Sequence, residues 1–274
     1  MTLVFTTLFI LCLTSRTSCQ SSIGRVLVAT SAGTTMWVRS MRRGVDTSEI
    51  AVADASRTPC DFNDEECITN SFNETLPAIA AGIPTLGVKP SDPLKMEIII
   101  GVLPKLTYIF RNAVMTGYKD CIVTNALLKL ETTKFIYDLL CPSIVLKGDY
   151  EMNGQMFENV INGKGNGTVV TENIHIQIDA DLEKYKSDTG KEHILIRTAQ
   201  IEHHERTNVV IGFDHINKDN DELAAKILKR LNENWLAASK YAEGPAFRFA
   251  MNLFIQNINT YFKKVPLDEL FYKV

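Results

Sequence analysis

Apolar residues recur every three or four positions from Asp219 to about Lys264, and this spacing predicts one very long amphipathic helix. Asp219 and Glu222 have the spacing of a capping box, which would start the helix. Gly244-Pro245 interrupts the pattern, and because proline lacks an amide hydrogen we expect either a bend near Ala242 or the start of a second helix with Pro245 in its first turn. At about 1.5 Å per residue the helix would span roughly 65 Å, which is longer than a compact domain of this size is wide. The preceding segments therefore have to wrap it.

Residues 94–213 have the pattern of antiparallel strands. Apolar and polar side chains alternate in residues 174–178 and in residues 94–100. The side chains expected on the buried face of the latter segment are Leu94, Met96, Ile98 and Ile100. Turns are expected at Asn153-Gly154, in the glycine-rich segment 163–167 and at 188–190. We expect six to eight long strands, which twist and coil because of their length.

A short helix is expected before the strands. Apolar residues at helical spacing cover residues 68–80, Gly82 is placed to end the helix, and Pro77 is expected to kink or split it. The whole order predicts an α+β fold: a long C-terminal α-helix wrapped by a strongly curved antiparallel β-sheet, with a short N-terminal helix. A cylinder and a curled sheet do not match along their whole length, so we expect an elongated apolar cavity between them.

The start of the chain predicts secretion. The apolar run from Leu3 to Leu13 is too short to span a bilayer and is typical of a signal peptide, here residues 1–19, although a membrane anchor is the alternative. Residues 20–58 have no consistent period and are interpreted as a flexible leader, and residues 59–274 as the folded domain. No later segment has the ~18 uncharged apolar residues of a membrane span, so we expect no stable membrane insertion.

Extracellular location changes how the cysteines and asparagines are interpreted. Cys60 and Cys67 close a short acidic loop. Cys121 and Cys141 each lie ten residues from Glu131, so a chain reversal there would bring them together, either as a disulfide or as two free buried thiols. Two sequons mark candidate glycosylation sites, at Asn73 and Asn166.

Composition and motifs give no support for an enzyme, a metal or a nucleic-acid partner. The net charge is −3 and the charges are interspersed, so no basic stripe is present to bind nucleic acid. The glycines of residues 163–167 join two strands rather than opening a helix, unlike a phosphate-binding loop. Residues 202–205 (Glu-His-His-Glu) lack the helical spacing of a zinc motif, and we interpret them as a solvated loop or sheet edge. His175 alternates with isoleucines and is expected to face outward. We expect no catalytic residues and no cofactor.

Several motifs occur in an order that resembles a known family. They are Cys60 and Cys67 with the short helix, Gly82-Ile-Pro-Thr-Leu-Gly-Val, Asp92-Pro93-Leu94, Pro142, Gly148-Asp-Tyr150 with Gly154, Gly163-Lys-Gly165, Leu231-Asn-Glu-Asn-Trp235 and Val265-Pro-Leu-Asp-Glu-Leu-Phe271. Over about residues 59–272 the chain resembles the insect haemolymph juvenile-hormone-binding and takeout-like proteins.

This resemblance implies a tubular, lipid-binding-like roll that carries a small hydrophobic ligand in extracellular fluid. It also implies a disulfide between Cys60 and Cys67. The second bridge of the hormone-binding members does not fall clearly on Cys121 and Cys141, which places the chain nearer the takeout-like branch. The ligand would be a juvenile hormone-like terpenoid, a fatty acid or a related lipid.

Eight apolar residues are the candidates for lining the cavity, and each has plain core packing as its alternative. They are Phe72, Leu76, Ile79, Met96, Ile98, Trp235, Phe249 and Phe254. An extracellular signalling or interaction protein that binds a cell-surface receptor, with an incidental cavity, is the second hypothesis for function. An esterase-like enzyme is the third.

Overall fold

The structure is a computed structural model that describes residues 59–272, except for the side chains of residues 205 and 206. The expected signal peptide and leader lie outside the described residues. The elements, in order, are β1 (Cys60–Asp61), α2 (Glu65–Ala81), η1 (Pro84–Leu86), β2 (Leu94–Val102), β3 (Leu106–Thr116), η2 (Tyr118–Asp120), β4 (Ile122–Lys129), β5 (Lys134–Met156), β6 (Asn159–Lys186), β7 (Glu192–Phe213), α3 (Asp221–Glu233), α4 (Trp235–Ala242), α5 (Gly244–Phe262), α6 (Leu267–Leu270) and β8 (Phe271–Tyr272).

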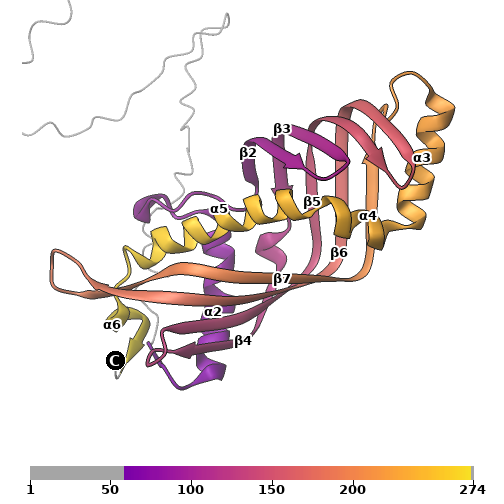
Figure 1. Ribbon diagram of the computed structural model, residues 1–274. Coiled ribbons are helices and arrows are strands. Elements are labelled where there is room, and N and C mark those ends of the chain that lie inside the picture. The colour runs from indigo at the N-terminus through magenta and orange to yellow at the C-terminus, as the bar shows by residue number, and fades with distance from the viewer. Residues whose placement is uncertain (1–58, 273–274) are drawn as a thin grey trace, which may run out of the picture. The chain divides into compact units, whose positions relative to one another are not determined.

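One antiparallel sheet dominates the fold. Its order is β2-β3-β5-β6-β7, and β4 also pairs with β5 (Figure 1). β5, β6 and β7 are 23, 28 and 22 residues long. Each therefore runs through both halves of the sheet, the half that contains β3 and the half that contains β4. β3 pairs with the second half of β5 and β4 with its first half, so that β3 and β4 follow one another along the same side of β5. The prediction of an α+β fold with long antiparallel strands is confirmed.

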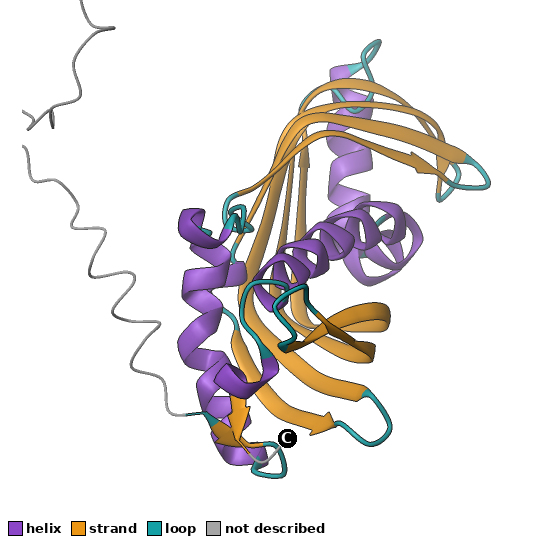
Figure 2. Ribbon diagram, turned by 90° about the vertical axis from the view of Figure 1, so that its left-hand side faces the viewer, coloured by secondary structure: helices purple, strands orange, loops and turns teal. Residues whose placement is uncertain are grey.

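The sheet is strongly curved but not closed (Figure 2). Three asparagines, Asn112, Asn125 and Asn173, have positive φ angles of 50–54° at places where the strand register shifts. Asparagine tolerates this left-handed conformation better than other non-glycine residues. A β-bulge at such a point bends the strand and increases its twist. Each side chain also donates a hydrogen bond to a neighbouring strand, as from Asn112 Nδ2 to Asp149 Oδ2 at 3.0 Å.

The β-bulge at Asn112 changes which face of β2 is buried, so the predicted buried face is right for only part of the strand. In β3 the buried residues change from Ala113 and Met115 to the even-numbered positions that end at Phe110. β2 changes in the same way, from buried Leu94 and Met96 to buried Ile99. Ile98 and Ile100 are consequently 40% and 56% exposed, so their predicted place on the buried face is wrong. A single bulge exchanges the two faces of a strand because side chains alternate.

The predicted C-terminal helix is present as three consecutive helices. The expected second helix with Pro245 in its first turn is α5, whereas the separation of α3 from α4 was not expected. α3 and α4 meet at Asn234, whose backbone (φ −117°, ψ 35°) leaves the helical region, and Glu243 separates α4 from α5. The first helix is capped by Asn220, which accepts the Leu223 amide hydrogen at 2.9 Å, and not by Asp219. α2 ends before Gly82 as predicted and is not split at Pro77.

α5 lies in the hollow of the curved sheet and packs against β2 and β7, the edge strands at the two ends of the strand order (Figures 1 and 2). The two edges do not pair with each other, and the helix occupies the space between them. Phe254, Ile258 and Tyr261 of this helix are almost completely buried. The prediction that the sheet wraps the C-terminal helix is therefore confirmed for α5.

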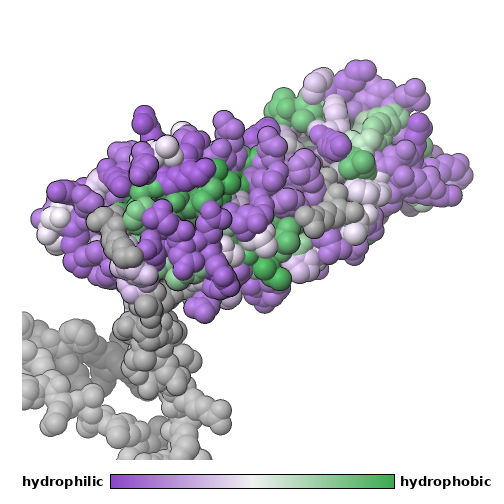
Figure 3. Space-filling model, turned by 90° about the horizontal axis from the view of Figure 1, so that it is seen from below, coloured by the Kyte–Doolittle hydropathy of each residue, from purple (hydrophilic) through white to green (hydrophobic). Residues whose placement is uncertain are grey.

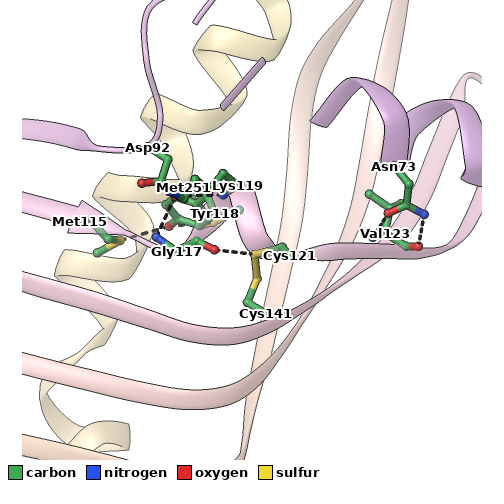
Figure 4. Close-up of a disulfide and its surroundings, with 10 residues drawn as sticks. All are labelled: Asn73, Asp92, Met115, Gly117, Tyr118, Lys119, Cys121, Val123, Cys141 and Met251. Atoms are coloured by element: carbon green, nitrogen blue, oxygen red, sulfur yellow. Dashed lines mark hydrogen bonds between the residues drawn. A yellow bond between two sulfur atoms is a disulfide. The ribbon is translucent and has the colours of Figure 1, made fainter. Parts of the chain in front are cut away.

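Three asparagine side chains fasten helices to the backbone of edge strands. Asn259 of α5 accepts the Ile196 amide hydrogen at 2.7 Å and donates to the Ile196 carbonyl at 2.8 Å. Asn232 of α3 makes the same pair of hydrogen bonds with Ile211 of β7. Asn73 of α2 makes it with Val123 of β4 (Figure 4). An amide group is suited to this role because it presents one donor and one acceptor to unpaired strand backbone.

We expect Asn259→Ala to lower the free energy of unfolding by about 1–3 kcal/mol, because it leaves the backbone groups of Ile196 without their partners. Urea denaturation would measure this change. Asn252→Ala on the exposed side of the same helix is the control and should change stability by less than about 0.5 kcal/mol. Equal effects of the two substitutions would show that the Asn259 hydrogen bonds do not hold the helix to the sheet.

Two predicted turns are in fact strand interior. Asn153-Gly154 lies within β5 and residues 163–167 lie within β6. The chain reverses instead at Phe157 and Glu158, both of which have positive φ. The glycines serve close packing: a Cβ atom at Gly163 would lie 2.6 Å from the Ile216 Cα atom, where the chain after β7 crosses β6. The turn predicted at 188–190 is present.

Two disulfides are present, Cys60–Cys67 and Cys121–Cys141. Figure 4 shows the second of them. The second joins the residue before β4 to the middle of β5, with the two Cα atoms 4.1 Å apart. It closes a loop with a sequence separation of 20 residues, worth about 3 kcal/mol of stability on the chain-entropy view.

The two sequons differ in their surroundings. Asn166 is exposed, whereas Asn73 is half-buried and its Nδ2 donates to both Thr69 and Val123. An N-glycan takes one of the two Nδ2 hydrogens, so it would break one of these hydrogen bonds and separate α2 from β4. We expect protein from a eukaryotic secretory host to carry a glycan at Asn166 and none at Asn73. Peptide mass spectrometry would check this, and a glycan on most copies of Asn73 would contradict the Asn73–Val123 contact.

Candidate ligand-binding cavity

An apolar cavity lies between the concave face of the sheet and the α4–α5 junction. It has a volume of about 130 Å³ and is lined by residues of β3, β5, β6 and β7 on one side and of α3, α4 and α5 on the other. It lies mainly in the half of the sheet that contains β3, and it extends to Ile174 and Ile176 of β6, beside Cys141 and Leu139 of β5. The expectation of an apolar hollow between helix and sheet agrees with this cavity, although the hollow is shorter than the helix it follows.

The walls combine aromatic rings with flexible methionines. Phe110, Tyr150 and Phe213 pack together, with ring centroids 4.7–6.3 Å apart, at one part of the sheet. Met115, Met152 and Met156 also line the space. Methionine has three rotatable side-chain bonds and a polarisable sulfur, so it adapts to the shape of what lies against it. The cavity can therefore widen through side-chain rotation alone.

Tyr118 lies at the end of the cavity that points toward the part of the sheet that contains β4. Its ring stacks on Phe254 of α5 with the centroids 5.2 Å apart. Its hydroxyl group contacts the sulfur atoms of Met115 at 3.2 Å and Met251 at 3.6 Å (Figure 4). Complete burial raises the pKa of the Tyr118 hydroxyl, so the group stays neutral at physiological pH. Phe254 lies behind this ring and does not line the cavity.

The opposite wall is held by hydrogen bonds from β3 to the helices. The Tyr108 hydroxyl donates to the Ala242 carbonyl at 2.9 Å, and the Tyr241 hydroxyl accepts the Lys105 amide hydrogen at 3.2 Å. Burial, the largest cause, raises the pKa of Tyr108 to about 12, and the charge of Glu243 also raises it. Tyr108 is therefore a fixed neutral donor, and the α4–α5 junction is held in place over the cavity.

One polar pair lies at the helix junction. Glu243 lines the cavity, and its Oε1 is 2.7 Å from Nε2 of His203 on β7. The His203 ring packs on Phe247 with the centroids 4.1 Å apart. Residues 202–205 lie in the edge strand β7, as one of the two interpretations held, but the His203 and Glu243 side chains are only 18% and 24% exposed, so His203 is not solvated. His204 is exposed, as expected for adjacent residues of a strand.

The structure brings none of the eight predicted lining residues to this cavity. Leu76, Ile79, Met96 and Phe254 are buried in the core around it; Phe72 and Trp235 are half-buried; and Ile98 and Phe249 are each 40% exposed. Phe72 packs on Phe135 and Tyr137, at the α2 side of the sheet. The ligand-contacting role of these residues stays a prediction.

Several residues that do line the cavity follow the alternation of a β-strand, a pattern that is visible in the sequence. Leu106, Tyr108 and Phe110 alternate with Thr107 and Ile109, the spacing of one strand face. The same period connects Ile144 with Leu146 in β5. Glu243 had no such signal, because only its place between two helices brings it to the cavity.

The chemistry of the cavity is that of binding. Fixed rings, adaptable methionines and few polar groups are typical of sites for apolar small molecules.

Within residues 59–272 no group of three or more His, Cys, Asp or Glu side chains is arranged to hold a metal ion. No helix in this part of the chain is long and apolar enough to cross a membrane. The surface in Figure 3 is mostly hydrophilic, with apolar atoms exposed in small patches.

Comparisons with known proteins agree with the fold. The structure of Takeout 1 from Epiphyas postvittana matches with a TM-score of 0.75 and 26% sequence identity, over 78% of this chain and 99% of that one. A lipopolysaccharide binding protein gives a TM-score of 0.35 at 12% identity, over 77% of this chain and 40% of that one. Curated protein sequences give no significant match. The sequence profile of the haemolymph juvenile hormone binding proteins matches residues 45–272, which is most of the chain. The chain belongs to the haemolymph juvenile hormone binding protein family.

Proposed function

We propose that this protein is a secreted carrier that binds one small hydrophobic ligand in the cavity beneath the α4–α5 junction. The observation that carries this proposal is the cavity itself, enclosed by aromatic and methionine side chains on the concave face of the sheet. Membership of the family and the likeness to Takeout 1 support it. The ligand classes are a juvenile hormone-like terpenoid, a fatty acid or a related lipid.

Carriage requires no chemical step, only burial of apolar surface. Burying about 400 Å² at ~25 cal/mol/Å² supplies roughly 10 kcal/mol before the costs of association, which allows micromolar to nanomolar affinity. The cavity volume of about 130 Å³ is smaller than the roughly 300 Å³ at the lower end of ligand pockets. Binding of a lipid therefore includes widening of the cavity, and the methionine side chains supply the freedom for it.

Secretion belongs to the same proposal. Residues 1–19 are the signal peptide, residues 20–58 a leader, and residues 59–274 the ligand-binding domain. The presence of two disulfides supports an oxidising compartment. The family profile begins at residue 45 and so includes the last part of the proposed leader.

Ligand extraction tests the proposal. The protein is purified from the medium of a eukaryotic secretory host, extracted with organic solvent, and the extract is analysed by mass spectrometry. We expect an apolar molecule in a ratio near one to one, and displacement of a fluorescent fatty acid by that molecule. An extract without lipid, from a protein that also fails to bind the fluorescent fatty acid, would contradict carriage and favour an interaction protein instead.

A further inference from the structure

A polar hollow lies on the outer face of the sheet, on the side opposite the ligand cavity. In β3 the cavity is lined by Tyr108 and Phe110, whereas the hollow is lined by Ile109 and Arg111, and successive side chains of a strand point to opposite faces. The hollow has a volume of about 370 Å³. It therefore falls within the range of about 300–1,000 Å³ that is usual for small-molecule sites.

The strand register arranges the side chains of the hollow in two rows across β3, β5 and β6. The first row is Ile109, Glu151 and Lys164, and the second is Arg111, Asp149 and Asn166. Between the rows the backbone of Tyr150 and Gly165 forms the floor. The hollow thus has a fixed floor of paired strands and walls of longer side chains.

The walls present hydrogen-bond donors and acceptors together. Arg111 and Lys164 only donate, whereas the carboxylates of Asp149 and Glu151 only accept. Among the described side chains, no ion pair joins any two of these four residues. A sugar ring needs such a mixture, because its hydroxyl groups both donate and accept, and its apolar C–H face can lie on Ile109.

A sugar can reach this hollow through a covalent bond to Asn166. Asn166-Gly-Thr168 is a sequon, and Asn166 is exposed and belongs to the wall. Its Nδ2 atom lies 3.5 Å from Asp214 Oδ2, which is at the outer limit of a hydrogen bond. Little therefore keeps the Asn166 side chain from turning toward the hollow.

The two rows continue to exposed apolar residues on the edge strand β2. Ile100 pairs with Ile109, and Ile98 pairs with Arg111. Ile98 and Ile100 are 40% and 56% exposed. An edge strand with exposed aliphatic side chains is a place where a second chain can pair. Three strand spacings of about 4.8 Å, or about 14 Å in all, separate β6 from β2.

We propose that the N-linked glycan of Asn166 lies across the outer face of the sheet. Its first two N-acetylglucosamine rings occupy the hollow, and the mannose residues that follow cover Ile98 and Ile100. This inference rests on the secretion that belongs to the proposed function, and it does not depend on ligand binding. The glycan then stabilises the pairing of β3, β5 and β6 and shields the edge of β2.

The test is a thermal double-mutant cycle between the glycan and Arg111, which lies two strands away from Asn166. The protein is secreted by a eukaryotic host as the glycosylated chain and as Asn166→Gln, with occupancy checked by mass spectrometry. We expect the glycan to raise Tm by at least about 3 °C. Arg111→Ala should lower Tm by at least about 2 °C more in the glycosylated protein than in Asn166→Gln.

Arg197→Ala is the matched control. Arg197 is exposed on β7, in the half of the sheet that contains β4 and away from the hollow. Its substitution should change Tm equally in both backgrounds. Sedimentation velocity measures the shielding of β2: Asn166→Gln should self-associate at concentrations where the glycosylated protein is monomeric. Adding Ile100→Lys to Asn166→Gln should restore the monomer.

The outcomes separate this inference from the proposed function. An equal effect of Arg111→Ala in the two backgrounds, or secreted protein without a glycan at Asn166, would overturn the inference and leave carriage intact. Monomeric Asn166→Gln would overturn the shielding of β2. A protein that never reaches the medium would contradict the proposed secretion itself. If Asn166→Gln does not fold, enzymatic removal of the glycan from the folded protein supplies the unglycosylated background.

Discussion

Ala246→Phe is expected to weaken ligand binding by at least about a hundredfold. Ala246 is 7% exposed, belongs to the first turn of α5 and lines the cavity, so a phenyl ring at this position would occupy space that the ligand needs. Excluding roughly 110 Å² of apolar contact at ~25 cal/mol/Å² removes about 2.8 kcal/mol, which is about a hundredfold in affinity. Titration with a fluorescent fatty acid would measure the loss.

The matched control is Ala237→Phe. Ala237 is exposed on α4, close to the same helix junction, so the added ring would extend into solvent. We expect its binding to be unchanged and both variants to keep their near-ultraviolet circular dichroism. Full binding by folded Ala246→Phe would mean that the ligand lies elsewhere.

Phe254→Ala should have the largest effect on stability, a loss of about 3–5 kcal/mol. Phe254 is completely buried and stacks on Tyr118, so its removal leaves a cavity in the centre of the α5 interface. Phe249→Ala on the same helix is the control, because its ring is 40% exposed and should contribute less than about 1 kcal/mol. Urea denaturation of the two variants measures both values. Equal losses would contradict the packing of α5 against Tyr118.

The Phe254 variant also bears on ligand length. Removing the Phe254 ring frees Tyr118 to move toward α5. This movement would lengthen the cavity toward the part of the sheet that contains β4. We expect Phe254→Ala, if it remains folded, to bind longer alkyl chains better, relative to shorter ones, than the unaltered protein does. An unchanged preference would show that Tyr118 closes the cavity without support from Phe254.

The sequence predicted the class of fold because its strongest signals are local. Helical spacing over residues 219–264 and strand alternation in residues 174–178 each depend on neighbours in the chain, and both elements are present. The separation of α3 from α4 was not predicted, because an asparagine such as Asn234 is tolerated inside helices, whereas Pro245 did indicate the start of α5. The attachment of α3 and α5 to β7 had no local signal either, because it brings together residues far apart in sequence.

The candidate site was harder to predict for the same reason. Which face of a strand is buried depends on bulges, and the one at Asn112 exchanged the faces of both β2 and β3. Ile98 was assigned inward because its pattern continues from Met96 without a visible interruption. The glycines at Gly154 and Gly163 indicated turns, yet they allow close approach of another backbone segment, a contact that no local pattern reveals.

The most direct test of the central claim is a crystal structure with dodecanol that carries bromine at the far end of its chain. Anomalous scattering locates the bromine without interpretation of the remaining density. We expect one strong bromine peak inside the cavity, beside Tyr118 and between the Phe110 ring and helix α5. A bromine peak outside the curved sheet, or a cavity closed by its own side chains while the compound binds in solution, would contradict the account.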